Sequence, residues 1–347
     1  MPITKISISE VLLLKANLPL LDIRSPKEFA AGHIPGALSF PLFSDEQRHQ
    51  IGTAYKQISQ EKAVLMGLDF FGPNMSTMVK QAKKLAPDKE VLLHCWRGGM
   101  RSQSVAWLLD LAGFKVHLLG FGYKSYRHFV MEQFGKKYPM LLIGGATGSG
   151  KTEILNELSK LNEPVIELER LANHKGSAFG TIGMPPQGTI EQFENDLALE
   201  LAALDSGKTI WIEDESISIG KVNVPKSFHS QMRAAPVLKL EIPREVRVKK
   251  LAEEYCKVEK EILFGSITKI QKRLGGLATK EALTAIEAGD MEKMVEIALV
   301  YYDKAYQFEL DHKENIRIIN VPLETTNAAE NAEIVLNVAK KNGMLLS

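Results

Sequence analysis

Cysteine is scarce in this chain of 347 residues, and long apolar runs are missing. The two cysteines, Cys95 and Cys256, lie far apart and have no C-x-x-C spacing, which excludes a disulfide framework and a cysteine-rich zinc site. No apolar stretch approaches the roughly 20 residues of a membrane span, and charges interrupt the short apolar stretch near the start where a signal peptide would be continuous. We therefore expect a cytoplasmic protein without a membrane partner.

Net charge is also low, at +1, but it is unevenly distributed. Between Lys226 and Arg273 there are twelve Lys or Arg against six Asp or Glu, so the rest of the chain carries a net negative charge. Such a basic stretch favours a polyanionic partner, although solvated helix faces have the same composition. With 45% hydrophobic and 24% charged residues the chain has a globular composition, and its length predicts two domains.

The first third of the chain alternates short apolar strands with helical patterns. We predict strands at Pro19–Ile23, Glu90–His94 and Val116–Leu119. A helix is predicted at Ser102–Leu111, and Gly113 follows where a C-terminal cap belongs. Strands that alternate with helices favour a parallel sheet, so this part is predicted to be an α/β domain.

A polar, proline-bearing stretch at residues 135–139 separates this unit from a second one, and we place the boundary there, with domains at 1–136 and 137–347. The second unit is predicted to be a doubly wound parallel sheet with a helical insertion at about 244–310. Its predicted elements are the strand Met140–Gly144, the helix Lys151–Lys160, the strand Val165–Leu168, the helix Ile190–Leu204 with a Thr189-x-x-Gln192 capping box, the strands Thr209–Ile212 and Ile316–Val321, and a final helix from about Ala328 to Gly343.

The first candidate site is the loop His94-Cys95-Trp96-Arg97-Gly98-Gly99-Met100-Arg101-Ser102, which follows a strand and leads into a helix. At a helix N-terminus a thiolate meets unpaired N–H groups and the positive end of the dipole, and Arg97 and Arg101 add two cations. Two glycines allow successive amides to form an anion-binding nest. The loop therefore suits a nucleophilic Cys95 that carries a persulfide, perselenide or phosphate. The plain alternatives are a buried structural cysteine here, a structural His94 and an ordinary helix residue at Cys256.

The second candidate site matches the phosphate-loop pattern G-x-x-x-x-G-K-[ST], between an apolar strand and a helix, as the motif requires. Its backbone amides and lysine hold a di- or triphosphate, and its threonine is a ligand for Mg²⁺. The strand Thr209–Ile212 leads into two carboxylates that compete for the second magnesium ligand; Glu213 and Asp214 are both candidates, and we take Asp214 together with Thr152. The phosphate-binding residues are predicted to be Gly145, Gly148, Ser149, Gly150, Lys151 and Thr152.

The nature of the polyphosphate stays open. The absence of an Asn-Lys-x-Asp guanine-reading motif disfavours a GTPase, and a diphosphate that is not a nucleotide is equally compatible with the loop. The segment Glu169–Gly180 follows the second strand of this unit, at the sheet edge where ligands of such folds bind. Its Arg170, His174 and Lys175 suit an anionic substrate, and with Glu213 and Asp214 they are our substrate-binding candidates, although each taken singly also suits a solvated loop.

The first unit resembles the rhodanese family. Its opening, Leu21-Asp22-Ile23-Arg24-Ser25-Pro26 followed by Gly32-His33-Ile34-Pro35-Gly36-Ala37, is similar to the signature of that fold, and the Cys95 loop is similar to its active-site loop. The resemblance implies that Cys95 carries a chalcogen. The spacing Cys95-x5-Arg101 is one residue longer than in many single-domain rhodaneses and is also seen in related cell-cycle phosphatases, so selenium transfer and phosphate-ester hydrolysis both stay open.

The whole chain resembles the tRNA 2-selenouridine synthase family. The motifs that carry the resemblance are Cys95 to Ser102, Gly144 to Thr152, Leu168 to Gly180, Glu213-Asp214-Glu215-Ser216, Arg273-Leu274-Gly275-Gly276 and Tyr301-Tyr302-Asp303. The resemblance implies a transferase that replaces sulfur by selenium at the wobble 2-thiouridine of tRNA with selenophosphate, by way of S-geranylation from geranyl diphosphate. It implies no tightly bound cofactor, Mg²⁺ as a possible helper, and two partners: the anticodon stem-loop of tRNA and an enzyme that supplies selenophosphate.

In this interpretation Lys151 and Thr152 hold the diphosphate of the prenyl donor, and Cys95 serves the selenium step. The basic stretch is the candidate tRNA surface, and Tyr255, Phe264 and Trp96 are aromatics that could stack an anticodon base, although each is more typical of a core. A rival interpretation is an ATP-dependent small-molecule kinase with a regulatory rhodanese-like or phosphatase-like module. A sulfur-relay binding protein would leave the phosphate loop unexplained.

Overall fold

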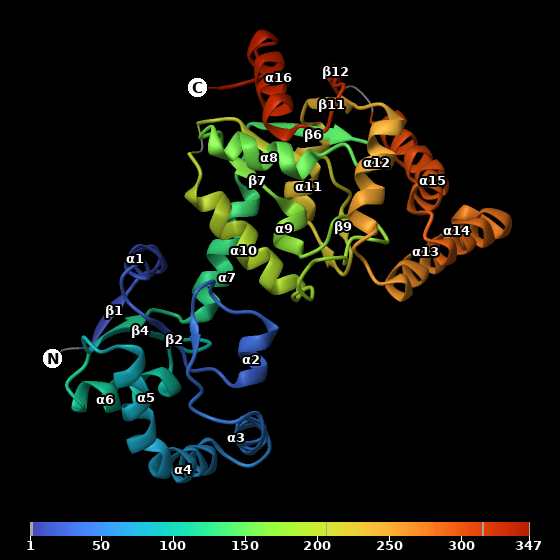
Figure 1. Ribbon diagram of the computed structural model, residues 1–347. Coiled ribbons are helices and arrows are strands. Elements are labelled where there is room, and N and C mark those ends of the chain that lie inside the picture. Colours follow the sequence, from blue (N-terminus) through green and yellow to red (C-terminus); the bar gives the residue numbers. More distant parts are fainter. Residues whose placement is uncertain (1–2, 206, 314–315, 347) are drawn as a thin grey trace. The chain divides into compact units, whose positions relative to one another are not determined.

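The computed structural model describes residues 3–205, 207–313 and 316–346. By its internal contacts the chain divides into two compact units, Met1–Gln133 and Phe134–Ser347 (Figure 1). Both are α/β, with strands that alternate with helices in sequence. The predicted fold class is therefore confirmed. In the described residues no helix combines the length with the apolar run that crossing a membrane would need.

The first unit is built on a parallel sheet with the strand order β1-β5-β4-β2-β3. Because neighbouring strands are parallel, the C-terminal ends of β2 and β4 meet at one edge, where Asp22 pairs in register with His94. The predicted strands are confirmed, and the predicted helix begins two residues early, at Met100. The elements are β1 Thr4–Ile6, α1 Ile8–Leu14, β2 Leu20–Asp22, α2 Pro26–Ala31, β3 Leu38–Ser39, α3 Asp45–Gln57, α4 Gln60–Phe71, a 3₁₀ turn Gly72–Asn74, α5 Met75–Leu85, β4 Glu90–His94, α6 Met100–Leu111, β5 Lys115–Leu119 and α7 Tyr123–Gly135.

The second unit has a parallel sheet with the order β12-β11-β6-β8-β7 and a short antiparallel pair, β9 with β10. Its helical insertion, α12 to α15, stands between β11 and β12 in the sequence. The elements are β6 Met140–Gly145, α8 Lys151–Lys160, β7 Val165–Ile166, α9 Leu168–Ala172, α10 Ile190–Ala203, β8 Ile210–Glu213, β9 Ser218–Ile219, β10 Val222–Asn223, α11 Lys226–Ala234, β11 Val237–Glu241, α12 Arg244–Tyr255, α13 Lys260–Leu274, α14 Gly276–Ala288, α15 Met291–Asp311, β12 Ile318–Pro322 and α16 Ala328–Lys341.

Several predicted strand limits in this unit were wrong by one or two residues, including those of the last strand, which was predicted at Ile316–Val321 and lies at Ile318–Pro322. The strand predicted to reach Leu168 ends at Ile166, because Leu168 begins the short helix α9. The strand predicted to end at Ile212 continues through Glu213. The predicted helix start at Thr189 is confirmed, since its hydroxyl accepts a hydrogen bond from the amide of Gln192.

The insertion has an apolar core of its own, separate from the core between the sheet and its helices. Leu263, Ile267 and Ile286 are buried there at the contacts of α13 and α14. Phe179, from the loop after α9, joins the same core. The loop after α9 thus packs against the insertion, and together they line the site described next.

Candidate active sites

Cys95 lies directly after β4, at the N-terminal side of α6, and only 2% of its surface is exposed. Its thiol donates to the hydroxyl of Ser102 at 3.2 Å, and that hydroxyl donates to the carbonyl of Gly99 at 3.1 Å. The loop is held from behind by Gly122, whose φ is +59°. A Cβ at this position would lie 2.3 Å from the Cys95 carbonyl oxygen, so glycine is needed for the close approach.

The surroundings of Cys95 favour the thiolate. Burial by itself raises the pKa of the thiol. The hydrogen bonds that Ser102 and the Arg97 amide donate to the deprotonated sulfur, together with the charge of Arg101, more than offset it. The pKa therefore lies below its ordinary value. A thiolate that persists at lower pH is the reactive form of cysteine, as the sequence predicts for this loop.

We expect Ser102→Ala to raise the pKa of Cys95, because the variant removes the largest stabilising hydrogen bond to the thiolate. The measurement is a pH titration of thiolate ultraviolet absorbance in a Cys256→Ser background, which leaves Cys95 as the one thiol of the sequence. Ser104→Ala on the same helix is the control, because its hydroxyl bonds only to the Met100 carbonyl among the described contacts. An unchanged midpoint in Ser102→Ala would contradict the assignment.

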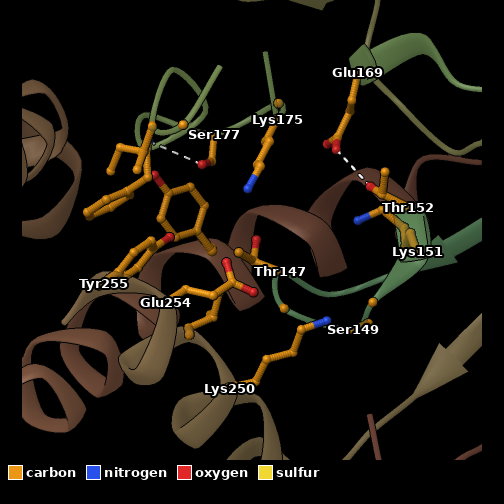
Figure 2. Close-up of a pocket in the computed structure, with 18 of the residues that line it drawn as sticks. Thr147, Ser149, Lys151, Thr152, Glu169, Lys175, Ser177, Lys250, Glu254 and Tyr255 are labelled. Carbon is orange, nitrogen blue, oxygen red and sulfur yellow. Dashed lines mark hydrogen bonds between the residues drawn. The ribbon is translucent and has the colours of Figure 1, made fainter. Parts of the chain in front are cut away.

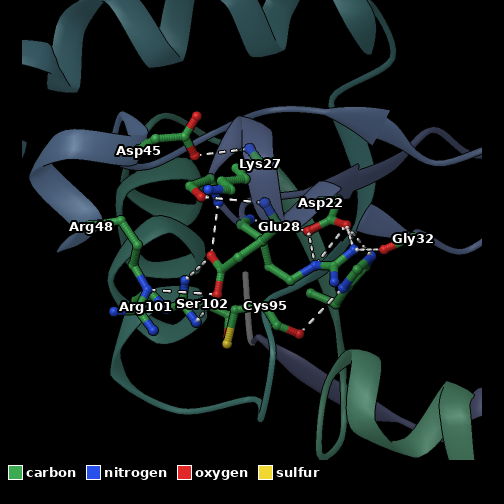
Figure 3. A network of polar contacts seen from close by, with 12 residues as sticks. Asp22, Lys27, Glu28, Gly32, Asp45, Arg48, Cys95, Arg101 and Ser102 are labelled. Carbon is green, nitrogen blue, oxygen red and sulfur yellow. Dashed lines mark hydrogen bonds and ion pairs between the residues drawn. The ribbon is translucent and has the colours of Figure 1, made fainter. Parts of the chain in front are cut away.

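The two arginines of the loop behave differently. Arg101 forms an ion pair with Glu28, with Nη1 2.8 Å from Oε2, and Arg48 approaches the other carboxylate oxygen at 3.6 Å (Figure 3). Glu28 also accepts the amide of Ser25 at 3.0 Å, which ties the start of α2 to α6. Arg97 is exposed and has no ion pair within the described part of the chain. Arg97 is thus the more accessible cation for an incoming anion, and Arg101 is a positioned one.

Beneath the loop lies a buried polar group at the edge shared by β2 and β4. Arg24 donates to both carboxylate oxygens of Asp22 and to the Gly32 carbonyl, and its guanidinium lies 3.8 Å from the centre of the Tyr123 ring. His94 is fully buried, and burial lowers its pKa, so it is neutral and structural. The network supports the Cys95 loop from below.

The phosphate loop lies in the second unit, where β6 passes into α8, and opens on a cavity of about 1270 Å³ (Figure 2). Gly148 and Gly150 have φ of +84° and +78°. At Gly148 a Cβ would lie 2.9 Å from Leu251 of α12, so only glycine lets the loop pass under the insertion. Lys151 folds back over the loop, and its Nζ donates to the Gly145 carbonyl at 3.2 Å. The predicted phosphate-binding residues are thus brought to one cavity.

Carboxylates meet the loop beside Thr152. The hydroxyl of Thr152 donates to Glu169 at 3.1 Å (Figure 2). The carboxylates of Glu169 and Glu215 both lie against Gly176. Burial, and then the charge of Glu169, raise the pKa of Glu215 to about 8. Asp214, the predicted magnesium ligand, is instead paired with Lys313.

This donor set fits a divalent cation that is also held by phosphate. Among the described residues, no group of three or more His, Cys, Asp or Glu side chains is arranged to bind a metal alone. Mg²⁺ usually takes one or two carboxylates and completes its shell with phosphate oxygens and water. Two crowded carboxylates, one of them with a raised pKa, gain from a nearby cation. Thr152, Glu169 and Glu215 are therefore the residues that suit it.

The structure separates the predicted substrate-binding residues. Lys175 and Asp214 line the cavity, whereas the other three are absent from its described lining. Arg170 is paired with Glu200 at 2.7 Å. His174 is buried, and Glu213 is fully buried, with a pKa raised by burial and a hydrogen bond from the Leu168 amide. Arg170, His174 and Glu213 are thus engaged with other parts of the protein rather than with the cavity.

Residues of the insertion also line the cavity, and of these the sequence analysis named Tyr255 alone as a candidate for stacking a base. Lys250 pairs with Glu153 at 2.6 Å beside the phosphate loop. Arg247 joins the loop to the insertion, donating to the Thr147 carbonyl at 3.0 Å and to both carboxylate oxygens of Asp303 at 2.9 Å.

Of the three aromatics considered for base stacking, only Tyr255 lines this cavity in the described residues. Its ring stacks on Phe179, with ring centres 5.1 Å apart. Phe264 packs against the core of the insertion, and Trp96 tilts over Tyr123 in the other unit.

Comparisons with known proteins cover both units. A family model described as "tRNA 2-selenouridine synthase AAA domain" matches residues 138–327, and one described as "Rhodanese-like domain" matches residues 8–128. A tRNA 2-selenouridine synthase of Bdellovibrio bacteriovorus is 34% identical, and the alignment covers 86% of this chain and 88% of the relative. Those of Shewanella sediminis and a Sulfurovum species are also 34% identical, covering 86% and 85% of this chain and 89% of each relative.

Proposed function

The chain belongs to the tRNA 2-selenouridine synthase family, and on this basis we propose that it converts the wobble 2-thiouridine of tRNA into 2-selenouridine through an S-geranylated base. The observation that carries the proposal is the composition of the cavity. A phosphate loop with an apolar wall of Leu251, Phe179 and Tyr255 in the same cavity suits a ligand with a diphosphate head and a hydrocarbon tail. Geranyl diphosphate has this shape.

In the first step the sulfur of 2-thiouridine attacks carbon 1 of the prenyl group. The bond from carbon 1 to the diphosphate oxygen breaks, the electron pair leaves with the diphosphate, and the base loses its N3 proton to solvent. The loop amides and Lys151 stabilise the charge that gathers on the leaving group, as preorganised donors do in phosphate sites. Lys175 reaches into the same cavity and adds a second cation (Figure 2).

Magnesium would be held by Thr152, Glu169 and Glu215, and when bound it would neutralise charge on the diphosphate. Glu169 and Glu215 would then be ligands of the cation. Asp214 remains with Lys313, which keeps its charge balanced inside the fold.

In the second step the selenium of selenophosphate attacks carbon 2 of the geranylated base, the carbon–sulfur bond breaks, and geranylthiolate leaves with the electron pair and takes up a proton. Water then attacks phosphorus, and the phosphorus–selenium bond breaks with its electron pair going to selenium. Phosphate is released, and the base, now 2-selenouridine, takes up a proton at N3. Alkylation makes this possible because the geranylthiolate is a better leaving group than the sulfur of the unmodified base. The Cys95 loop serves this step, with Arg97 as the accessible cation for the donor phosphate. A separate enzyme supplies the selenophosphate.

The cations of the basic stretch from Lys226 to Arg273 that are exposed and not held in ion pairs are proposed to bind the tRNA backbone, because backbone phosphates supply most of the affinity in such complexes. The affinity for the anticodon stem-loop should then fall steeply with salt.

The test is mass spectrometry of nucleosides from 2-thiouridine-containing tRNA incubated with the protein, geranyl diphosphate, Mg²⁺, ATP and selenophosphate, with each donor omitted in turn. We expect S-geranyl-2-thiouridine without selenophosphate and 2-selenouridine with both donors. Unchanged 2-thiouridine, with ATP hydrolysed in its place, would favour the kinase.

A further inference from the structure

The aromatic side chains of the cavity form a connected series from its mouth to its interior. Phe179 stacks on Tyr255, and its ring meets Tyr302 edge-on at 6.4 Å. Tyr302 is tilted against Tyr301, with ring centres 5.0 Å apart. The Tyr301 hydroxyl accepts a hydrogen bond from Arg273 at 2.7 Å, and the guanidinium lies 5.9 Å from the ring centre. The series therefore ends in a polar pair contributed by α13 and α15.

Arg273 has no carboxylate partner in the described part of the chain. Among the described residues it makes no ion pair, whereas Lys250 in the same lining is paired with Glu153. The Arg273 side chain is exposed, while Phe179 at the inner part of the series is 4% exposed. An apolar chain would gain little against the Arg273 end, but a ligand with a π-face and a phosphate would gain at both groups.

The cavity also has room for a second ligand. Its volume of about 1270 Å³ exceeds the roughly 300–1,000 Å³ of the usual pocket for one small molecule. A diphosphate at Lys151, with its tail along Leu251 and Tyr255, leaves the Arg273 end free.

We infer that Tyr301 and Arg273 form the subsite for the reacting base: Tyr301 stacks on the pyrimidine of a splayed-out nucleotide, and Arg273 holds an adjacent backbone phosphate. Single-stranded bases are commonly held in this way, by aromatic rings and arginine forks. The hydrogen bond between the two residues orients the ring and the guanidinium together. The inference rests on the proposed function, because it assigns the base to the cavity that holds the prenyl donor.

The position of the base is tested by photocrosslinking. The full chain is irradiated with an anticodon stem-loop RNA that carries 5-iodouridine at the wobble position, and the attachment site is mapped by mass spectrometry. We expect attachment at Tyr301, and its loss in Tyr301→Leu. Attachment at Trp96 or Phe264, or to no residue of this cavity, would overturn the inference.

Affinity gives a second, independent measure. Stacking on an aromatic ring contributes about 1–3 kcal/mol per base, so Tyr301→Leu should weaken stem-loop binding by about tenfold or more, whereas Tyr301→Phe should keep most of it. Arg273→Met should weaken binding more than Lys304→Met, which removes one charge from an exposed residue of α15 outside the cavity lining. Equal losses in Arg273→Met and Lys304→Met would overturn the role of Arg273.

Binding of the prenyl donor distinguishes a failure of this inference from a failure of the proposed function. Geranyl diphosphate should bind Tyr301→Leu as tightly as the original protein, which also shows that the variant is folded. If the original protein geranylates tRNA and Tyr301→Leu does so with an unchanged KM for the stem-loop, the base subsite is wrong and the proposed function stands. If the original protein forms no geranylated product, the proposed function fails, and with it this subsite.

Discussion

Replacing Lys151 by alanine is expected to lower the rate of S-geranylation by about 10²–10³-fold, the usual effect of removing one preorganised charge-stabilising group from a transition state. Lys151 stands at the first position of α8, where the loop amides and the helix dipole already favour an anion. Its Nζ donates only to a backbone carbonyl among the described contacts, so it is available to a diphosphate. The measurement is kcat/KM for formation of S-geranyl-2-thiouridine in a stem-loop RNA.

The control for this variant is Lys160→Ala, at the other end of the same helix. Lys160 is exposed and forms an ion pair with Glu157, one turn away. Its removal should leave geranylation within about twofold, because an exposed pair of this kind contributes little. Lys151→Ala should still convert RNA that is geranylated in advance to the selenated product. Full geranylation by Lys151→Ala would place the diphosphate elsewhere.

Both candidate loops could be predicted because each is a continuous segment with a strand before it and a helix after it. The conformation of such a loop is determined by residues within it, namely by glycines such as Gly148 and by the first residues of the helix. The structure adds what holds each loop in place, and these contacts come from distant positions. Arg101 meets Glu28 across 73 residues, and Arg247 meets Asp303 across 56. Local pattern indicates which faces are apolar but not which elements meet.

The acidic segment after β8 shows a different limit of sequence analysis. Side chains alternate between the two faces of a strand, so a strand that runs one residue further decides which carboxylate enters the core. Glu213 is the last residue of β8 and is fully buried, while Asp214 and Glu215 line the cavity. The sequence analysis considered only Glu213 and Asp214 as the second magnesium ligand and therefore missed Glu215. It also missed Glu169, because the residues of α9 were predicted as the end of a strand and a loop.

The largest expected effect is that of Cys95→Ala on the selenium step. The variant removes the thiol on which the surrounding hydrogen bonds and charges of the loop act. We therefore expect the yield of 2-selenouridine to fall by roughly 10³-fold or more, as when a group that acts as a unit with its surroundings is removed from an active site. Geranylation should continue, because the phosphate loop belongs to the other unit. S-geranyl-2-thiouridine should therefore accumulate when both donors are present, and nucleoside mass spectrometry over time measures it directly.

Cys256→Ala is the matched control for this variant, since Cys256 is the other cysteine of the chain and is exposed at the end of α12. It should give normal yields of both products. A stricter test supplies Cys95→Ala with RNA that is already geranylated, so that only the second step is measured. Conversion of this RNA at the original rate would show that selenium reaches the base without the thiol. The Cys95 loop would then serve as an anion site for the donor, through its amides and Arg97, and a lowered thiol pKa would have no part in the chemistry.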